Sequence, residues 1–100
     1  MTIHVLIACS KTKSIPASKD LIWGSKTNVE NWSKAWSKQS ELVPASELYN
    51  GRAFKQQLAI CQQQKKVRTY ILSAGAGFIS NIDTNIPSYE ATFLSNYGPL

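Results

Sequence analysis

An apolar run near the start of the chain, Ile3–Ala8, changes abruptly at Cys9 into the polar sequence Ser10-Lys11-Thr12-Lys13. Short continuous apolar runs are typical of parallel strands, so Ile3–Ala8 predicts a strand that is buried on both faces. At the carboxyl end of such a strand, backbone N–H groups, hydroxyls and ammonium groups can converge on one anion, commonly a phosphate. The run therefore predicts where a site lies and which ligand chemistry it suits, but it does not specify a reaction.

Length and composition limit the class of protein. One hundred residues make one small domain, residues 1–100, and 43% apolar with 17% charged residues is ordinary for a globular chain. No apolar run approaches the roughly 18 residues of a membrane span, and no basic segment precedes the first strand. We therefore expect a cytoplasmic protein that has no membrane partner.

The two cysteines, Cys9 and Cys61, are too few for a disulfide framework and form no CxxC pair. With His4 as the one further candidate ligand, we expect no metal site and no cofactor. The net charge of +5 points weakly towards polyanions. Because the lysines are scattered, a moderately basic surface and contact with nucleic acid remain alternative interpretations.

A strand–helix–strand unit follows from a change in apolar period. Phe54, Leu58 and Cys61 recur at i, i+4 and i+7 and predict a helix over residues 51–66. The β-branched and aromatic run 67–73 predicts a strand. A helix between two strands favours a right-handed, parallel βαβ unit.

A parallel arrangement places residues 9–13 and 73–77 at the same edge of the sheet, where open α/β sheets bind ligands. Gly75 and Gly77 would then allow a positive φ or a close approach of backbone to a ligand, although a tight turn without a ligand is an alternative. The Gly-x-Gly sequence lacks the third glycine of a dinucleotide fingerprint, and no Walker pattern occurs.

Residues 18–42 form an insertion or an irregular helical segment in this interpretation. Asn28 is a candidate N-cap for a short helix over 28–38. Trp32 and Trp36 on that helix, beside lysines, suit stacking on nucleic acid, but tryptophans at helical spacing more often lie in a core.

The loop near the end of the chain carries Asp83, Tyr89 and Glu90. Asp83 and Glu90 are candidates for general acid–base chemistry together with Tyr49, and Glu47 and Cys9 are the other polar groups near these loops with that potential. Loop carboxylates are, however, more often solvated than catalytic. Glu90 or Asp83 is the candidate base, and Cys9 is the candidate nucleophile.

The order of these segments resembles a known family through four short motifs: Ala8-Cys9-Ser10-Lys11-Thr12-Lys13, Pro44-Ala45-x-Glu47-Leu48-Tyr49, Ile71-Leu72-Ser73-Ala74-Gly75-x-Gly77 and Ile86-Pro87-x-Tyr89-Glu90. Over residues 3–93 the chain is similar to a small bacterial and phage domain of unknown function allied to the YaaA-like peroxide-stress proteins. The resemblance implies an α/β sandwich and a role near DNA, nucleotides or base modification. Many members carry Lys-Tyr-Gly or Tyr-Gly where this chain has Gly75-Ala76-Gly77, so a ligand contact from that lysine or tyrosine would be missing.

The predicted fold class is α/β, with a Rossmann-like parallel or mostly parallel sheet and flanking helices. Two strands do not make an independently stable sheet. We therefore expect an incomplete N-terminal portion of a larger domain, or a sheet completed by self-association as a homo-oligomer, unless residues 14–50 supply a further strand.

The predicted function is binding, and in one version processing, of a phosphorylated small molecule or a nucleic acid at the carboxyl edge of the sheet. An enzyme of this kind would modify a nucleotide or base by a glycosyl-transfer-like reaction. The alternative is a non-catalytic module that binds nucleic acid or protein. The candidate ligand-binding residues are Ser10, Lys11, Thr12, Lys13, Ser73, Gly75, Gly77 and Tyr89.

Overall fold

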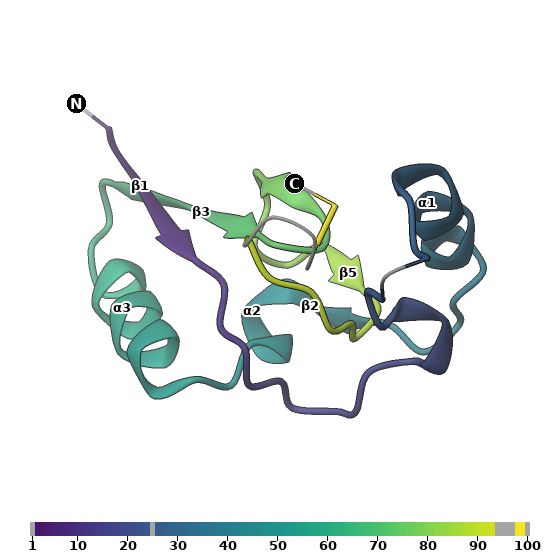
Figure 1. The fold of residues 1–100 in the computed structure, drawn as a ribbon. Helices are drawn as coiled ribbons and strands as arrows, with labels where there is room; N and C mark the ends of the chain where they lie inside the picture. The colour runs from purple at the N-terminus through teal and green to yellow at the C-terminus, as the bar shows by residue number, and fades with distance from the viewer. Residues whose placement is uncertain (1, 25, 94–97, 100) are drawn as a thin grey trace.

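A computed structural model describes residues 2–24, 26–93 and 98–99 of the chain. Its main sheet has three strands in the order β1-β3-β4. Strand β1 (Ile3–Ala8) runs parallel to β3 (Val67–Ser73), and β4 (Gly77–Ile79) returns antiparallel to β3 after a tight turn (Figure 1). The sheet is therefore mixed and small.

Helix α3 (Arg52–Gln62) directly precedes β3 in the chain and packs on one face of the sheet, against β1 and β3. Its buried residues Phe54, Leu58 and Cys61 belong to the stripe at i, i+4 and i+7, and Ile7 and Ile71 are buried on the strands. The predicted parallel pairing of these two strands is confirmed, and a helix precedes β3 as predicted, although it ends at Gln62 instead of residue 66. Between β1 and α3 the chain also forms η1, α1, β2 and α2.

The prediction that β1 is buried on both faces is wrong. Ile7 is 4% exposed, whereas its neighbour Leu6 is 53% exposed. Helix α3 covers one face, and the other face carries His4, Tyr70 and Phe78, whose rings stack in a row at 5.6 and 5.3 Å. A continuous apolar run thus does not distinguish a doubly covered strand from one whose second face is open to solvent.

A second, two-stranded sheet lies in the middle of the molecule. Strand β2 (Val43–Pro44) pairs antiparallel with β5 (Asn85–Ile86), and the short helix α2 (Ala45–Leu48) follows β2 directly. Residues 14–50 therefore do contain a further strand, but it belongs to this second sheet and does not extend the main one.

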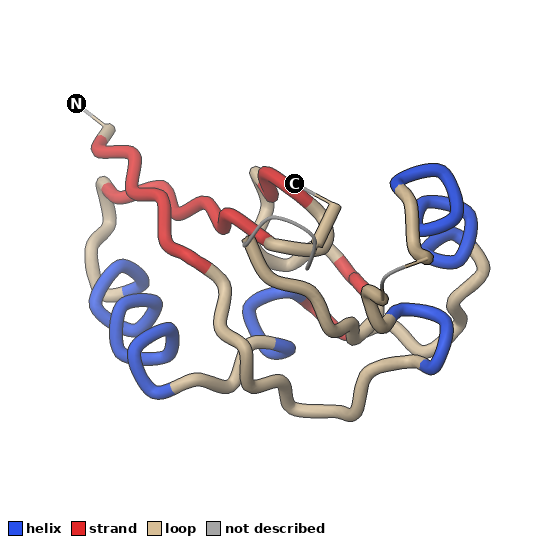
Figure 2. The backbone as a smooth tube through the Cα atoms, viewed as in Figure 1, coloured by secondary structure: helices blue, strands red, loops and turns tan. Residues whose placement is uncertain are grey.

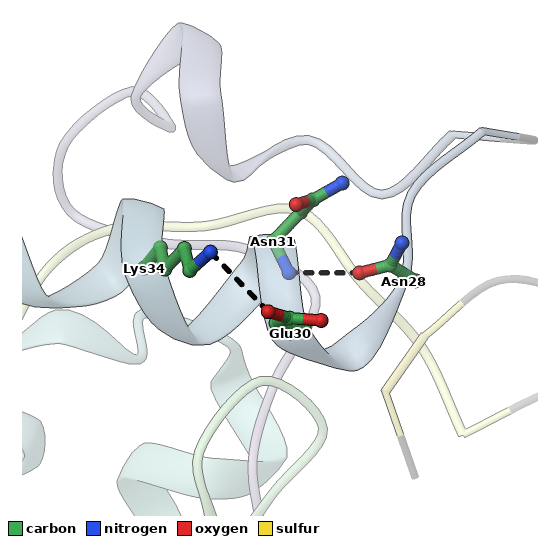
Figure 3. A network of polar contacts seen from close by, with 4 residues as sticks. All are labelled: Asn28, Glu30, Asn31 and Lys34. Atoms are coloured by element: carbon green, nitrogen blue, oxygen red, sulfur yellow. Dashed lines mark hydrogen bonds and ion pairs between the residues drawn. The ribbon is translucent and has the colours of Figure 1, made fainter.

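The segment 18–42 contains a 3-10 turn, η1 (Lys19–Leu21), and helix α1 (Val29–Ser37). The predicted N-cap is confirmed, because Asn28 Oδ1 accepts a hydrogen bond from the Asn31 backbone N–H at 2.8 Å (Figure 3). Figure 3 also shows the ion pair between Glu30 and Lys34, one turn apart at 3.3 Å. Helix α1 lies at the opposite end of the molecule from α3, and a long loop after β1 leads towards it (Figure 2).

None of the helices in the described part of the chain combines the length and the apolar character needed to cross a membrane.

Candidate functional site

Three hydroxyl groups from distant parts of the chain meet in the interior. Tyr49 follows α2, Ser73 ends β3, and Tyr89 lies in the loop after β5. The Tyr49 hydroxyl lies 2.7 Å from both Ser73 Oγ and the Tyr89 hydroxyl, and the third side of the triangle, Ser73 to Tyr89, is 2.9 Å. We call this buried group, each member at most 1% exposed, the tyrosine centre.

Every hydroxyl of the tyrosine centre can be fully hydrogen-bonded within the group. If Tyr49 donates to Ser73, Ser73 to Tyr89 and Tyr89 to Tyr49, every hydroxyl donates once and accepts once. The Ala76 backbone N–H also donates to Ser73 Oγ at 3.0 Å, which occupies that oxygen's second lone pair. Ser73 is therefore fully engaged within the protein, in a position where the sequence predicts a ligand contact.

Burial raises the pKa of Tyr49 to about 12, because a phenolate would lose its hydration there, although the bonds from Ser73 and Tyr89 oppose the shift. Burial also raises the pKa of Tyr89, and a negative charge on Tyr49 would raise it further. Both phenols are thus neutral hydrogen-bonding groups over the ordinary pH range.

Aromatic side chains from α1 enclose Tyr89. The Trp32 and Trp36 rings lie 6.2 and 5.6 Å from the Tyr89 ring, and Trp32 Nε1–H donates to the Gly75 carbonyl at 2.9 Å. A Cβ at Gly75 would lie 2.7 Å from the Tyr89 ring, so this position requires glycine. Gly75 therefore allows a close approach, as predicted, but the group that approaches is the protein's own tyrosine.

Lys13 lies on the solvent side of Tyr89. Its Nζ is 4.4 Å from the centroid of the Tyr89 ring, a cation–π distance. Burial lowers the pKa of the Lys13 ammonium below 10.5, and negative charge on Cys9 and Glu90 offsets part of this shift. Lys13 is thus a partly desolvated cation held by an aromatic face.

An open hollow of about 480 Å³ lies beside this lysine. We call it the lysine hollow; its lining comprises Lys11, Lys13, Ser14, Ile15, Pro16, Ala17, Ser88, Tyr89 and Glu90. Two hydrogen bonds hold its walls together. Ser88 Oγ donates to the Ile15 carbonyl at 2.8 Å, and the Glu90 N–H donates to the Leu21 carbonyl at 2.8 Å.

Cys9 lies between the main sheet and these groups and is half-buried. The Ala74 backbone N–H donates to Cys9 Sγ at 3.3 Å, which links the ends of β1 and β3. The predicted meeting of these two loops is therefore observed at Cys9 and Ala74, as expected for parallel strands in register.

Ser10 and Thr12 hold the loop after β1 in place. The Ser10 hydroxyl donates to the Thr12 carbonyl at 2.6 Å and accepts from the Gly51 N–H at 3.0 Å. The Thr12 carbonyl also accepts from the Asn50 N–H at 2.8 Å. These contacts fix the loop against the start of α3 and thereby aim Lys13 at Tyr89.

The structure does not bring all the predicted site residues together. Lys11, Lys13, Tyr89 and Glu90 line one hollow, with Cys9 close by. Asp83 instead follows Asn81 and Ile82, which line a different hollow at the beginning of β3, and its carboxylate lies 3.4 Å from Ser46 Oγ. Gly77, the first residue of β4, has φ +81°, a backbone conformation that the β3–β4 hairpin requires there.

Tyr49 belongs to the tyrosine centre but is absent from the predicted ligand-binding residues. It was predicted only as a candidate for acid–base chemistry. Its signal in the sequence is the Leu48-Tyr49 pair after a proline-led turn of helix, but that pattern alone does not show that its hydroxyl meets Ser73 and Tyr89. The described residues contain no group of three histidine, cysteine or carboxylate side chains placed to hold a metal.

Comparison with known families gives one result. The model of a family of unknown function, DUF6884, matches residues 33–97, which are 65 of the 100 residues. The chain belongs to this family. The DUF6884 match includes Tyr49, Ser73 and Tyr89, whereas Cys9 and Lys13 precede it. Neither the curated proteins nor the solved structures give a match to the chain.

Proposed function

We propose that the protein binds the phosphoryl group of a nucleotide, or of a nucleic-acid end, in the lysine hollow. The observation that carries this proposal is the Lys13 ammonium at 4.4 Å from the Tyr89 ring, at the wall of a 480 Å³ hollow. Lys13 forms no ion pair with a carboxylate among the described residues, in which the ion pair is the one between Glu30 and Lys34. A partly desolvated cation without a paired carboxylate favours an anionic ligand.

The rest of the hollow suits the remainder of such a ligand. Lys11 is exposed and supplies a second positive charge at the rim. Ile15, Pro16 and Ala17 form a wall with apolar surface, against which a base or sugar can pack. A phosphate at the lysines and a flat group on this wall together support a nucleotide rather than free inorganic phosphate.

For a reaction on the bound ligand, we propose Glu90 and Cys9 as the catalytic residues. Glu90 lines the hollow and is exposed, which supports it as the base that accepts a proton from an incoming hydroxyl or water. Cys9 is the thiol near Lys13 and is the candidate nucleophile. Asp83 has less support as the base because of its place beside Ser46. A glycosyl-transfer-like reaction on a nucleotide is the reaction class that we propose.

Several broader expectations stand as parts of the same proposal. They are a relationship to the YaaA-like proteins, a role near DNA, a Rossmann-like extension of the parallel sheet, a cytoplasmic location and self-association. Stacking of nucleic acid on the tryptophans has less support, because Trp32 is 4% exposed and its indole N–H is bonded to Gly75.

Isothermal titration with a nucleoside monophosphate, a sugar phosphate and inorganic phosphate tests the proposal. We expect Lys13→Ala to weaken nucleotide binding roughly 10- to 100-fold, as for loss of a charged hydrogen bond. Lys26→Ala, which removes the same charge outside the hollow, is the matched control and should have little effect. Equal effects of the two substitutions, or no binding of any of these probes, would contradict the proposal.

A pH series sharpens this test. Because burial lowers the pKa of Lys13, we expect nucleotide affinity to begin to fall at a lower pH than for an ordinary lysine of pKa 10.5. The Lys13→Ala variant should lack that fall. A wild-type profile that matches the variant's across this range would remove Lys13 from the binding site.

A further inference from the structure

The positive charge of this protein is concentrated in one third of the chain. Residues 48–82 contain five lysines and arginines and no aspartate or glutamate. The other six basic residues are balanced by all six acidic residues of the chain, so the whole net charge of +5 comes from this segment. In the structure, the segment forms α3, β3 and β4.

We define the basic face as these five residues: Arg52, Lys55, Lys65, Lys66 and Arg68. They lie at the two ends of α3 and at the beginning of β3, and all five are exposed. None has an ion-pair partner among the described residues, in which Glu30 and Lys34 on α1 form an ion pair with each other. Helix α1 is at the other end of the molecule (Figure 1). The basic face is therefore an uncompensated cationic surface.

The surface around these charges carries amide side chains. Gln56 and Gln57 are exposed on α3, and Gln63 is exposed at its C-cap. An open hollow of about 600 Å³ lies where α3 ends and β3 begins, and its lining is mostly polar: Cys61, Gln62, Gln64, Val67, Arg68, Thr69, Ser80, Asn81 and Ile82. Amides and hydroxyls both donate and accept hydrogen bonds, as sugars, phosphates and base edges require.

We infer that the basic face binds the sugar–phosphate backbone of nucleic acid. The cations at the two ends of α3 are separated by the length of an 11-residue helix. That length is about 16 Å at 1.5 Å per residue, which corresponds to roughly five nucleotides of a B-form strand. Helix α3 exposes one large apolar side chain, Ile60, whereas a helix that inserts into a membrane surface presents a row of them. The surface therefore favours nucleic acid over an anionic bilayer.

This inference does not depend on the lysine hollow, because the basic face shares no residue with it. A circular single-stranded DNA separates the two sites experimentally, since it has no end to enter the hollow. The test variant is Lys55→Gln, Lys65→Gln and Lys66→Gln together. The matched control is Lys19→Gln, Lys26→Gln and Lys38→Gln together, which makes the same change in net charge at exposed positions outside residues 48–82.

Fluorescence anisotropy over a salt series gives the result. For the test variant, we expect the negative slope of log affinity against log salt to become shallower by about 2, with roughly 100-fold weaker binding near 0.1 M salt. The control variant should lose much less. Equal losses in both variants would overturn the inference, as would a wild-type protein that does not bind this DNA. Binding to phosphatidylserine vesicles that the test variant loses, with DNA binding unchanged, would assign the face to a membrane and also overturn it.

Discussion

The β1–α3–β3 unit and the tyrosine centre are stabilised in different ways. In the unit, a helix covers one face of a strand pair through a local apolar stripe, and the charged residues project into water. In the centre, three hydroxyls from distant segments close a hydrogen-bonded triangle surrounded by tryptophans. The first arrangement tolerates substitution on its open side, whereas the second requires each partner, because any buried hydroxyl left without one is costly.

Truncation of one tyrosine in each region tests this comparison most strongly. We expect Tyr89→Ala to lower the free energy of unfolding by about 3–5 kcal/mol, because it removes a buried ring and opens the hydroxyl triangle. Tyr70→Ala, on the open sheet face, should cost about 1–2 kcal/mol through its stacking with His4 and Phe78. Urea unfolding measures both, and similar losses would contradict the comparison.

Two glycines of the β3–β4 hairpin, Gly75 in the turn and Gly77 at the start of β4, are expected to give the next largest difference in stability. A Cβ at Gly75 would lie 2.7 Å from the Tyr89 ring, so we expect Gly75→Ala to cost about 2–3 kcal/mol by overpacking. Gly77→Ala meets no atom within 4 Å and should cost about 1 kcal/mol from its φ of +81° alone. Near-ultraviolet circular dichroism of the tryptophans should change for Gly75→Ala only. An unchanged spectrum in that variant would show that the Trp32–Gly75 contact is not sensitive to this packing.

Alkaline pH should destabilise the tyrosine centre specifically. Tyr49 has a pKa of about 12 when folded against 10.0 when unfolded, so its contribution is present below pH 10 and is lost as pH rises towards 12. The loss is about 1.4 kcal/mol per pH unit for each such group. Lys13 contributes with the opposite sign up to pH 10.5, because its folded pKa is lowered.

Urea unfolding across this pH range, in wild type and in Tyr49→Phe, separates these contributions. The variant should be less stable at neutral pH by about 1–3 kcal/mol, and its stability should fall less steeply above pH 10. A variant curve parallel to that of the wild type would show that Tyr49 does not retain its proton through burial.

The smallest effect is expected on the basic face. Lys55, Lys65 and Lys66 are exposed and have no ion-pair partner among the described residues, so their joint replacement by glutamine should change the free energy of unfolding by less than about 0.5 kcal/mol. A larger loss, measured by the same urea unfolding, would mean that these lysines stabilise the fold as well as the proposed contact with nucleic acid.

Local patterns account for the parts of the fold that the sequence predicts correctly. The stripe of Phe54, Leu58 and Cys61 predicts α3, and the Asn28 cap predicts α1. The parallel pairing of β1 with β3 was predicted from the helix that directly precedes β3. The open face of β1 could not be predicted, because an apolar run has the same composition whether or not a second layer covers it. The second sheet was also not predictable, since β2 and β5 have two residues each.

The sequence by itself determined the chemistry available at the end of β1, namely a thiol and two lysines after an apolar strand, and the concentration of net charge in residues 48–82. Only the tertiary structure decided which groups meet. In the folded chain Lys13 lies over the Tyr89 ring, and Ser73 accepts a hydrogen bond from Tyr49. Asp83 lies beside Ser46, on another part of the surface. The physical reason is the distance along the chain over which each interaction acts. The apolar period of a helix and its caps depend on residues a few positions apart, whereas the contact of Tyr49 with Tyr89 joins groups 40 residues apart. Such contacts depend on how all the intervening segments pack.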